Sequence, residues 1–398
     1  MGRKLRWIVP SLLILITLVV FSGAVLAEEE ETENSFSVGP LELEAESAYL
    51  LDAATGLSLH GISEHERRAP ASMTKIATMI LVFEAVQSGE IAWDEEVVVS
   101  PRASGMGGSQ VYLEAGEKMM VKDLLKAVAV SSANDASVAL AEYISGSHEA
   151  FVGDMNELVE RLGLTNTHFI NAHGLDNPEH YSSAHDMAHL GRHLVTTYPQ
   201  VLGYTSIWTD WLREDTDRPF WLTNTNRMIR QYPGVDGLKT GLTDESMWCL
   251  TATAKSNGTR LIVTVMGAPT SDARFDSVAT LLNAGFAAVE TIEFAQTGDV
   301  LGSLPVSEGE KQEVDVTVAR DAEVTIPRGR AGDLVGDISL IQQDLKAPVS
   351  VQETVGQLQI RLEGELLQEI PLVPVEVIER CGIGTIFVRM LQIMWLLN

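Results

Sequence analysis

An apolar stretch from Ala71 to Val86 constrains the fold of this chain more than any other part of the sequence. Its apolar residues recur at helical spacing, and they are dense enough that a helix here must be buried. The stretch therefore predicts a central helix against which other elements pack. Ser72 and Lys75 stand near its start, and residues three positions apart lie on one side of a helix, about one turn from each other.

The pair formed by Ser72 and Lys75 has a chemical interpretation and a structural one. A serine hydroxyl is a weak nucleophile at neutral pH and needs a base within hydrogen-bond reach. A lysine amine acts as that base only when it is neutral, which burial and nearby positive charge favour. The structural alternative is a helix-capping serine followed by a surface lysine. For an isolated Ser-x-x-Lys motif, this alternative is the more frequent one.

The first 27 residues have the pattern of a secretory signal peptide. A basic start precedes an apolar run at residues 8–20, and Val25-Leu26-Ala27 has the small residues expected before a cleavage site. An uncleaved membrane anchor is the alternative. No cysteine lies near Ala27, which argues against lipoprotein processing. The rest of the chain is long enough for about two domains.

The formal net charge of −27 narrows the classes of partner. A strongly acidic protein repels phosphate groups, so nucleic acid is not an expected partner. The two cysteines, Cys249 and Cys381, lie far apart in the sequence. We therefore expect no disulfide between them and no cysteine-based metal cluster.

The order of the predicted elements indicates an α+β fold. After an acidic spacer at residues 28–39, the segment 40–290 opens with two short strands and continues through a helix-rich middle. It ends with strands at 248–254 and 260–266 and a helix at 271–289. This order predicts a sheet flanked by helices, with a helical insert.

Two different segments complete the chain. Residues 291–374 alternate apolar and polar side chains between Gly and Pro, which predicts an all-β domain with strands at 313–318, at 322–326 and from 349 onward. Residues 375–398 have the pattern of an amphipathic helix. Its mostly apolar stretch, residues 383–397, is too short to span a bilayer, so we expect the helix to lie in the membrane interface. A last helix packed on the β domain is the alternative. The narrow polar face of this helix would contain Gly382, Thr385, Arg389 and Gln392.

Three short motifs occur in order within residues 40–290: Ser72-Met73-Thr74-Lys75, Ser132-Ala133-Asn134 and Lys239-Thr240-Gly241. Together they resemble the motifs of the penicillin-interacting serine enzymes, whose second motif has Asp where Ala133 stands here. The chain looks like a D-alanyl-D-alanine carboxypeptidase of the low-molecular-mass penicillin-binding proteins. The segments that carry the resemblance are Arg68–Lys75, Asn134–Ala136, His173–Asp176, Tyr181–Ala184, Asp236–Gly241 and Met266–Ala268.

The resemblance implies a β-lactamase/transpeptidase-like domain, an antiparallel sheet flanked by helices with a helical subdomain. It also implies catalytic roles for five residues. Ser72 would be the nucleophile and Lys75 the base that takes its proton. Ser132 would relay a proton to the leaving amine, and Asn134 would orient the lysine and bind a substrate amide. The backbone N–H groups of Ser72 and Leu242 would bind the oxyanion.

The resemblance also implies how substrate is held. Lys239 and Thr240 would bind the terminal carboxylate of the substrate, next to Gly241, with possible help from Arg274. Relatives often have an aromatic residue or histidine where Leu242 stands, so local substrate contacts differ here. The implied substrates are peptidoglycan stem peptides, with β-lactams as covalent inhibitors and no cofactor or metal. The protein would lie on the outer face of the cytoplasmic membrane.

Three other functions fit parts of the sequence. A D,D-endopeptidase acting on cross-linked wall would use the same residues. A class A β-lactamase shares the three motifs but needs a glutamate-held water, and no Glu followed four residues later by Asn lies between Asn134 and Lys239. A zinc hydrolase would use His185 and His189, which resemble a His-Glu-x-x-His motif with Asp in place of Glu.

Overall fold

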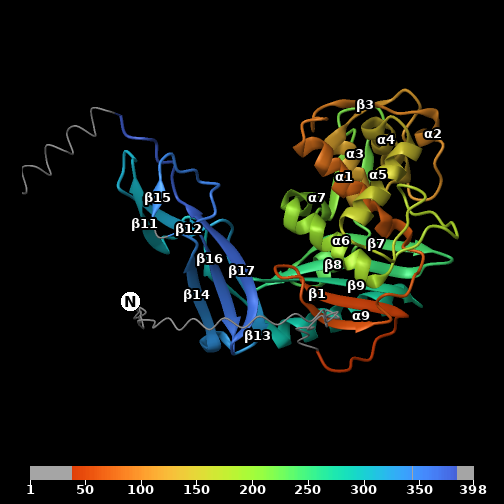
Figure 1. Ribbon diagram of the computed structural model, residues 1–398. Helices are drawn as coiled ribbons and strands as arrows, with labels where there is room; N and C mark the ends of the chain where they lie inside the picture. The colour runs from red at the N-terminus through yellow and green to blue at the C-terminus, as the bar shows by residue number, and fades with distance from the viewer. Residues whose placement is uncertain (1–37, 343, 383–398) are drawn as a thin grey trace, which may run out of the picture. The chain divides into compact units, whose positions relative to one another are not determined.

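The computed structural model describes residues 38–342 and 344–382 (Figure 1). The predicted signal peptide lies outside these residues, as does the predicted C-terminal helix from residue 383 onward. Its predicted first part, residues 375–382, forms no helix, because Ile378 and Arg380 make β-bridges with Val349 and Gly309. Among the described residues, no helix is both long and apolar enough to cross a membrane.

A five-stranded antiparallel sheet forms the centre of the first domain, with strand order β2-β1-β9-β8-β7. Its hairpin between β8 and β9 turns at Asn257-Gly258, where both residues have positive φ angles of 49° and 91°. That pair of angles suits the two-residue turn whose twist matches the flanking strands. The strands are β1 (Ser47–Asp52), β2 (Ser58–Ile62), β7 (Val235–Thr243), β8 (Met247–Ser256) and β9 (Thr259–Ala268).

Helices cover both faces of this sheet (Figure 1). Helix α9 (Ser271–Ala288) packs on one face through Phe275, Val278 and Leu282. Helices α1 (Lys75–Gln87) and α6 (Ala184–Thr197) pack on the other. Helix α1 is buried on almost all sides, as its apolar sequence predicts. One detail differs from the prediction, because Ser72 lies in a 3₁₀ turn, η1 (Ala71–Thr74), immediately before α1.

The helical insert contains α3 (Val121–Ser131), α4 (Asn134–Ser145) and α5 (His148–Arg161). In the sequence, the polar run Ser131–Asp135 interrupts an apolar stretch at 121–144, a pattern typical of a turn, and the turn between α3 and α4 lies within this run. The insert also includes the short α2 (Pro101–Ser104) and the paired strands β3 (Glu96–Val98) and β4 (Lys118–Met120). The buried carboxylate of Asp135 accepts hydrogen bonds from the backbone N–H groups of Val111 and Leu113, which ties the preceding loop to α4.

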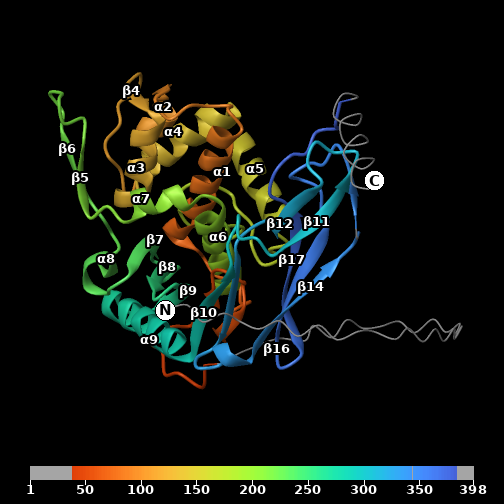
Figure 2. The same ribbon diagram turned by 90° about the vertical axis from the view of Figure 1, so that its left-hand side faces the viewer.

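A hairpin stands out from the helices beside α8 (Met228–Gln231), as Figure 2 shows. Its strands are β5 (Thr209–Leu212) and β6 (Phe220–Thr223), which pair in antiparallel register. The turns η2 (Pro199–Val201) and α7 (Leu202–Thr205) connect α6 to this hairpin.

The all-β domain has the alternating inward residues that the sequence predicts, and they form one core cluster. Its main sheet has the order β14-β16-β17-β12-β11-β15, and a second pair joins β10 to β13. The strand expected from residue 349 begins later, at Gly356. Val349 makes a single bridge with Ile378, and the chain then turns, because the Glu353 N–H donates to the carbonyl oxygen of Ser350. The elements are β10 (Val289–Ala295), β11 (Gly302–Ser307), β12 (Glu313–Val318), β13 (Ala322–Pro327), η3 (Ala331–Asp333), β14 (Leu334–Leu340), β15 (Leu345–Lys346), β16 (Gly356–Leu362) and β17 (Glu365–Pro374).

Candidate active site

The 3₁₀ turn that contains Ser72 is enclosed by two glycines from distant parts of the chain. Gly174, with φ +88°, approaches so closely that an added Cβ would overlap the carbonyl oxygen of Ala71 and lie 2.9 Å from the Ser72 nitrogen. A Cβ on Gly241 of β7 would lie 2.8 Å from the carbonyl oxygen of Pro70. The Ser72 turn is therefore held between a loop and the edge of β7, and only glycine fits at either contact.

The amine of Lys75 points back toward the serine. Its Nζ atom forms hydrogen bonds with Ser72 Oγ at 2.9 Å, with Asn134 Oδ1 at 2.7 Å and with the carbonyl oxygen of His173 at 2.6 Å. The side chain is fully buried, while Ser72 itself is partly exposed. The expectation that Lys75 lies buried beside Asn134 therefore agrees with the geometry.

Burial of Lys75 has a direct electrostatic consequence. Loss of solvation, together with the nearby positive charge of Lys239, holds the pKa of Lys75 well below the ordinary value for lysine, although Asp135 acts weakly in the opposite direction. All three acceptors of its hydrogen bonds are neutral, so no bonded carboxylate restores the charged form. The neutral amine that a general base requires is favoured here.

The second motif occupies the tight turn between α3 and α4. Ser132 has φ +60°, a left-handed conformation, and is the C-cap of α3. This turn brings Ser132 and Asn134 into the wall of the site, each 3% exposed. The amide of Asn134 is fixed, because its Nδ2 donates to the carbonyl oxygen of Gly107 at 2.7 Å. In the described part of the chain, the buried Ser132 Oγ has no hydrogen-bond partner.

The third motif lies on β7, beside the Ser72 turn. Burial, reinforced by the charge of Arg274, lowers the pKa of Lys239 to about 7. Thr240 Oγ1 donates to Thr225 Oγ1 at 2.7 Å. Thr225 belongs to none of the three motifs, so this contact could not be predicted from them. Leu242 follows Gly241 and is 50% exposed, so its side chain reaches solvent at the mouth of the site.

Arg274 projects from α9 and is almost fully buried. It donates to the carbonyl oxygen of Cys249 at 3.2 Å and lies over the rings of Trp248 and Phe275. These contacts fix the guanidinium within the protein. Its charge nevertheless influences Lys239, whose pKa it lowers.

Both cysteines, Cys249 and Cys381, are free thiols.

The loop at residues 171–176 makes contacts with the candidate site. Part of it, His173–Asp176, carries the family resemblance, but the sequence did not indicate a role for it. Asn171 Oδ1 accepts from the backbone N–H groups of His173 and Gly174, at 3.2 and 2.6 Å, and so shapes the turn that presents the His173 carbonyl to Lys75. Asp176 Oδ1 accepts from Thr243 Oγ1 at 2.7 Å, which joins the loop to the end of β7. A carbonyl acceptor has no side-chain signature, so the sequence could not have identified it.

The histidines considered for zinc lie on α6, where the rings of His185 and His189 are 4.3 Å apart between centroids. His65 lies 4.5 Å from the His185 ring, and burial, with His185 nearby, lowers the pKa of His189 to about 4. Within the residues that the structure covers, no group of three or more His, Cys, Asp or Glu side chains is arranged to hold a metal ion.

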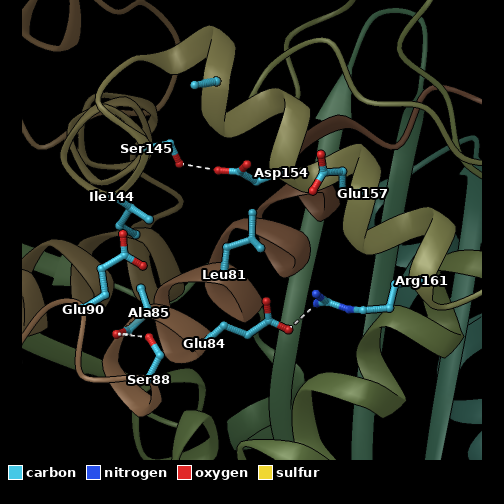
Figure 3. A pocket seen from close by; sticks show the side chains of 11 residues that line it. Leu81, Glu84, Ala85, Ser88, Glu90, Ile144, Ser145, Asp154, Glu157 and Arg161 are labelled. Atoms are coloured by element: carbon cyan, nitrogen blue, oxygen red, sulfur yellow. Dashed lines mark hydrogen bonds and ion pairs between the residues drawn. The ribbon is translucent and has the colours of Figure 1, made fainter.

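Two of the cavities in the described part of the chain can be compared with the site, and neither is lined by Ser72 or Lys75. One of about 450 Å³ adjoins the site, and its lining includes His148, His173 and Leu175. The other, of about 640 Å³, lies between α1 and α5 (Figure 3). Figure 3 shows Arg161 paired with Glu84 across this second cavity, at 2.5 Å. None of the three motifs contributes a residue to its lining.

A serine bonded to a buried lysine, with a second lysine and a threonine on the adjacent strand, is the arrangement of a serine hydrolase that works by acyl transfer. The model of the D-alanyl-D-alanine carboxypeptidase family matches residues 33–270, and that of the penicillin-binding protein 5 C-terminal domain matches residues 290–380. The chain therefore belongs to the D-alanyl-D-alanine carboxypeptidase family. The predicted fold class and type of enzyme are confirmed.

Similar proteins agree with this assignment. The carboxypeptidase DacF of Bacillus subtilis is 39% identical over 97% of this chain and 98% of its own, and DacA of Escherichia coli is 35% identical over 84% of each. Among solved structures, penicillin-binding protein 5 of Haemophilus influenzae superposes with a TM-score of 0.70 at 33% identity, covering 86% of this chain and 99% of that one. Penicillin-binding protein D2 of Listeria monocytogenes, solved in an ampicillin-bound form, has a TM-score of 0.56 at 33% identity, over 62% of this chain and 99% of that one.

The contact of Gly174 with the Ser72 turn predicts a large effect of one added methyl group. We expect Gly174→Ala to lower the free energy of unfolding by about 2–4 kcal/mol, because a left-handed backbone and a steric overlap are penalised together. Gly163→Ala is the matched control, since its φ is also positive, at +70°, but nothing lies within 4 Å of the added carbon. Urea denaturation of the two variants measures the difference. Equal losses would contradict the predicted close contact.

Proposed function

We propose that this protein removes the terminal D-alanine from peptidoglycan stem peptides through an acyl-enzyme on Ser72. The observation that carries the proposal is the 2.9 Å hydrogen bond between Lys75 Nζ and Ser72 Oγ. Lys75, whose burial favours the neutral amine, takes the proton of Ser72 as the serine oxygen attacks the carbonyl between the two D-alanines. The attack gives a tetrahedral intermediate whose oxygen becomes negatively charged.

The backbone N–H groups of Ser72 and Leu242 bind that oxyanion. Support comes from the close contact between Gly241 and the Pro70-Ala71 segment. Ser72 and Leu242 directly follow these contacting residues, so the contact keeps them near each other. Backbone donors fixed before the reaction need no reorganisation as charge develops. Because the donor is a backbone group, leucine at position 242 does not remove it.

Lys239 and Thr240 hold the terminal carboxylate of the substrate. A lysine with a pKa near 7 gains a favourable partner when a carboxylate arrives, and binding therefore favours its charged form. Ser132 lies at the end of α3 with its hydroxyl unbonded among the described residues, and it passes a proton to the leaving amine of D-alanine. Water then releases the shortened peptide from Ser72.

A covalent β-lactam provides the direct test. A labelled penicillin should attach to Ser72, and Ser72→Ala should remain unlabelled, while the exposed Ser88→Ala control labels normally. Loss of the base in Lys75→Met should slow labelling by about 100-fold or more. The measurement is mass spectrometry of the labelled peptide. Labelling of Ser72→Ala, or D-alanine release that a chelator abolishes and penicillin leaves intact, would refute the proposal.

We also propose that residues 1–27 direct export and that the C-terminal segment binds the outer face of the cytoplasmic membrane. The apolar face of residues 383–398 in the sequence supports this proposal.

Removal of residues 383–398 should move the mature protein from the membrane fraction to the soluble fraction. This truncation keeps Ile378, which bridges to Val349, and Arg380, which donates to the Ala347 carbonyl, so the β domain keeps these contacts. Penicillin labelling of the truncated protein serves as the control for folding. Continued membrane retention after the truncation, measured by cell fractionation, would contradict the anchor.

A further inference from the structure

The β5–β6 hairpin places two tryptophans side by side on a solvent-facing surface. Trp211 and Trp221 lie directly opposite each other in the strand register, with ring centroids 4.7 Å apart and ring planes at 67°. Their exposed fractions are 38% and 48%. Leu212 and Leu222, on the opposite face of the hairpin, are buried. The tryptophan pair is thus an exposed aromatic surface that the protein core does not use.

The hairpin is held firmly even though a two-stranded hairpin has little stability of its own. Lys126 donates to the carbonyl oxygen of Trp211 at 2.9 Å. Arg213, whose side chain is 8% exposed, donates to the carbonyl oxygen of Val111 at 2.6 Å and pairs with Glu117 at 3.0 Å. Lys126 from the helical insert and Arg213 from the hairpin therefore join the two, and they fix the backbone that presents the two rings.

The tryptophan surface continues to the candidate active site. Side chains alternate between the two faces of a strand, and Trp221, Thr223 and Thr225 are all exposed, whereas the residues between them are buried. Thr225 Oγ1 accepts the hydrogen bond of Thr240 Oγ1. Four residues of chain span at most about 13 Å. Trp221 therefore lies within about that distance of Thr225, the residue that contacts Thr240.

We propose that Trp211 and Trp221 form a binding site for the sugar rings of the peptidoglycan glycan. A pyranose ring has a face of C–H groups that packs on the π-face of an indole, which is apolar and has a partial negative charge. Two indoles set at a steep angle give one ring face to stack on and a second ring edge to flank it. The uncharged part of a glycan also tolerates the strongly acidic protein, which repels anionic polymers.

The tip of the hairpin argues against a membrane as the occupant of this surface. Exposed tryptophans also occur where proteins meet the membrane interface. Here the tip carries Glu214, Asp215 and Asp217, all exposed. Carboxylates beyond the aromatic pair would be repelled by anionic lipid headgroups, which attract basic residues.

The position of the surface indicates which glycan strand it binds, and this step rests on the function proposed above. Thr225 contacts Thr240, which holds the terminal carboxylate, so the hairpin lies on the side of the leaving group. The stem peptide that acylates Ser72 has its terminal carboxylate on this side, so the rest of that peptide and its own glycan extend away from the hairpin. The tryptophans therefore bind a neighbouring strand of the polymer, which in a cross-linked substrate is the strand that leaves.

The test uses the mature protein with Ser72→Ala, so that binding is separated from turnover, and glycan strands from which an amidase has removed the stem peptides. Retention is measured at high salt, which screens the carboxylate that the amidase leaves on each muramic acid from the acidic protein. Adding Trp211→Ala and Trp221→Ala should weaken retention on the strands about tenfold. The paired Phe substitutions should restore most of it. Phe294→Ala in the all-β domain, where the exposed fraction is also 38%, is the control and should change nothing.

A second readout compares substrates in the enzyme that retains Ser72. The ratio of D-alanine release from intact wall to release from a soluble pentapeptide should fall about tenfold in the Ala pair. Penicillin labelling of that variant shows whether the site is folded. Equal glycan retention by parent and Ala pair would overturn the proposal, as would a loss of binding to anionic vesicles in place of glycan. Because retention is measured without Ser72, it stands even if the proposed catalysis fails.

Discussion

Burial of one lysine amine is the constraint on which the rest of the site depends. Charged ammonium groups are strongly solvated, and taking Lys75 out of water without a bonded carboxylate favours its neutral form. The hydrogen bonds of its amine go to a serine hydroxyl, an amide oxygen and a backbone carbonyl. These acceptors come from the 3₁₀ turn, the start of α4 and the 171–176 loop. The packing of three separate segments therefore determines the chemistry of a single nitrogen.

Lys75 and Lys239 are both buried lysines, but their surroundings suit them to different proposed roles. Lys239 is also buried, yet its pKa falls only to about 7, so it can be charged when a carboxylate binds. Its charge then further disfavours protonation of Lys75. The base form of Lys75 is present above its lowered pKa, whereas the free-enzyme charge of Lys239 is lost as pH rises through about 7. A bound carboxylate favours the charged form of Lys239 and should extend that charge to higher pH.

Much of this arrangement is readable from the sequence. The three motifs located Ser72, Lys75, Asn134 and Lys239, and the structure brings these side chains together. The α+β order, the helical insert and the all-β domain follow from periodicity and turn residues. The tight turn at Ser132 was also signalled, because polar residues interrupt an apolar helical stretch there.

Sequence patterns could not predict two kinds of contact in the site: those made by backbone groups and those between residues far apart along the chain. The His173 carbonyl is an acceptor that every residue has, so its role depends only on where the loop lies. The close approach of Gly174 to Ala71 joins positions about one hundred residues apart along the chain. The partnership of Thr225 with Thr240 needs the β5–β6 hairpin to return to β7, and local patterns do not specify such a return.

The titration of Lys75 tests the central claim most directly. Lysine labelled with ¹³C at Cε, observed by NMR and assigned with Lys75→Met and Lys239→Met, reports the protonation of each amine. The expected result is a Lys75 signal that titrates well below the ordinary lysine pKa of 10.5, with Lys239 changing near pH 7. A Lys75 amine that remains charged up to about pH 10 would contradict its assignment as the base that activates Ser72.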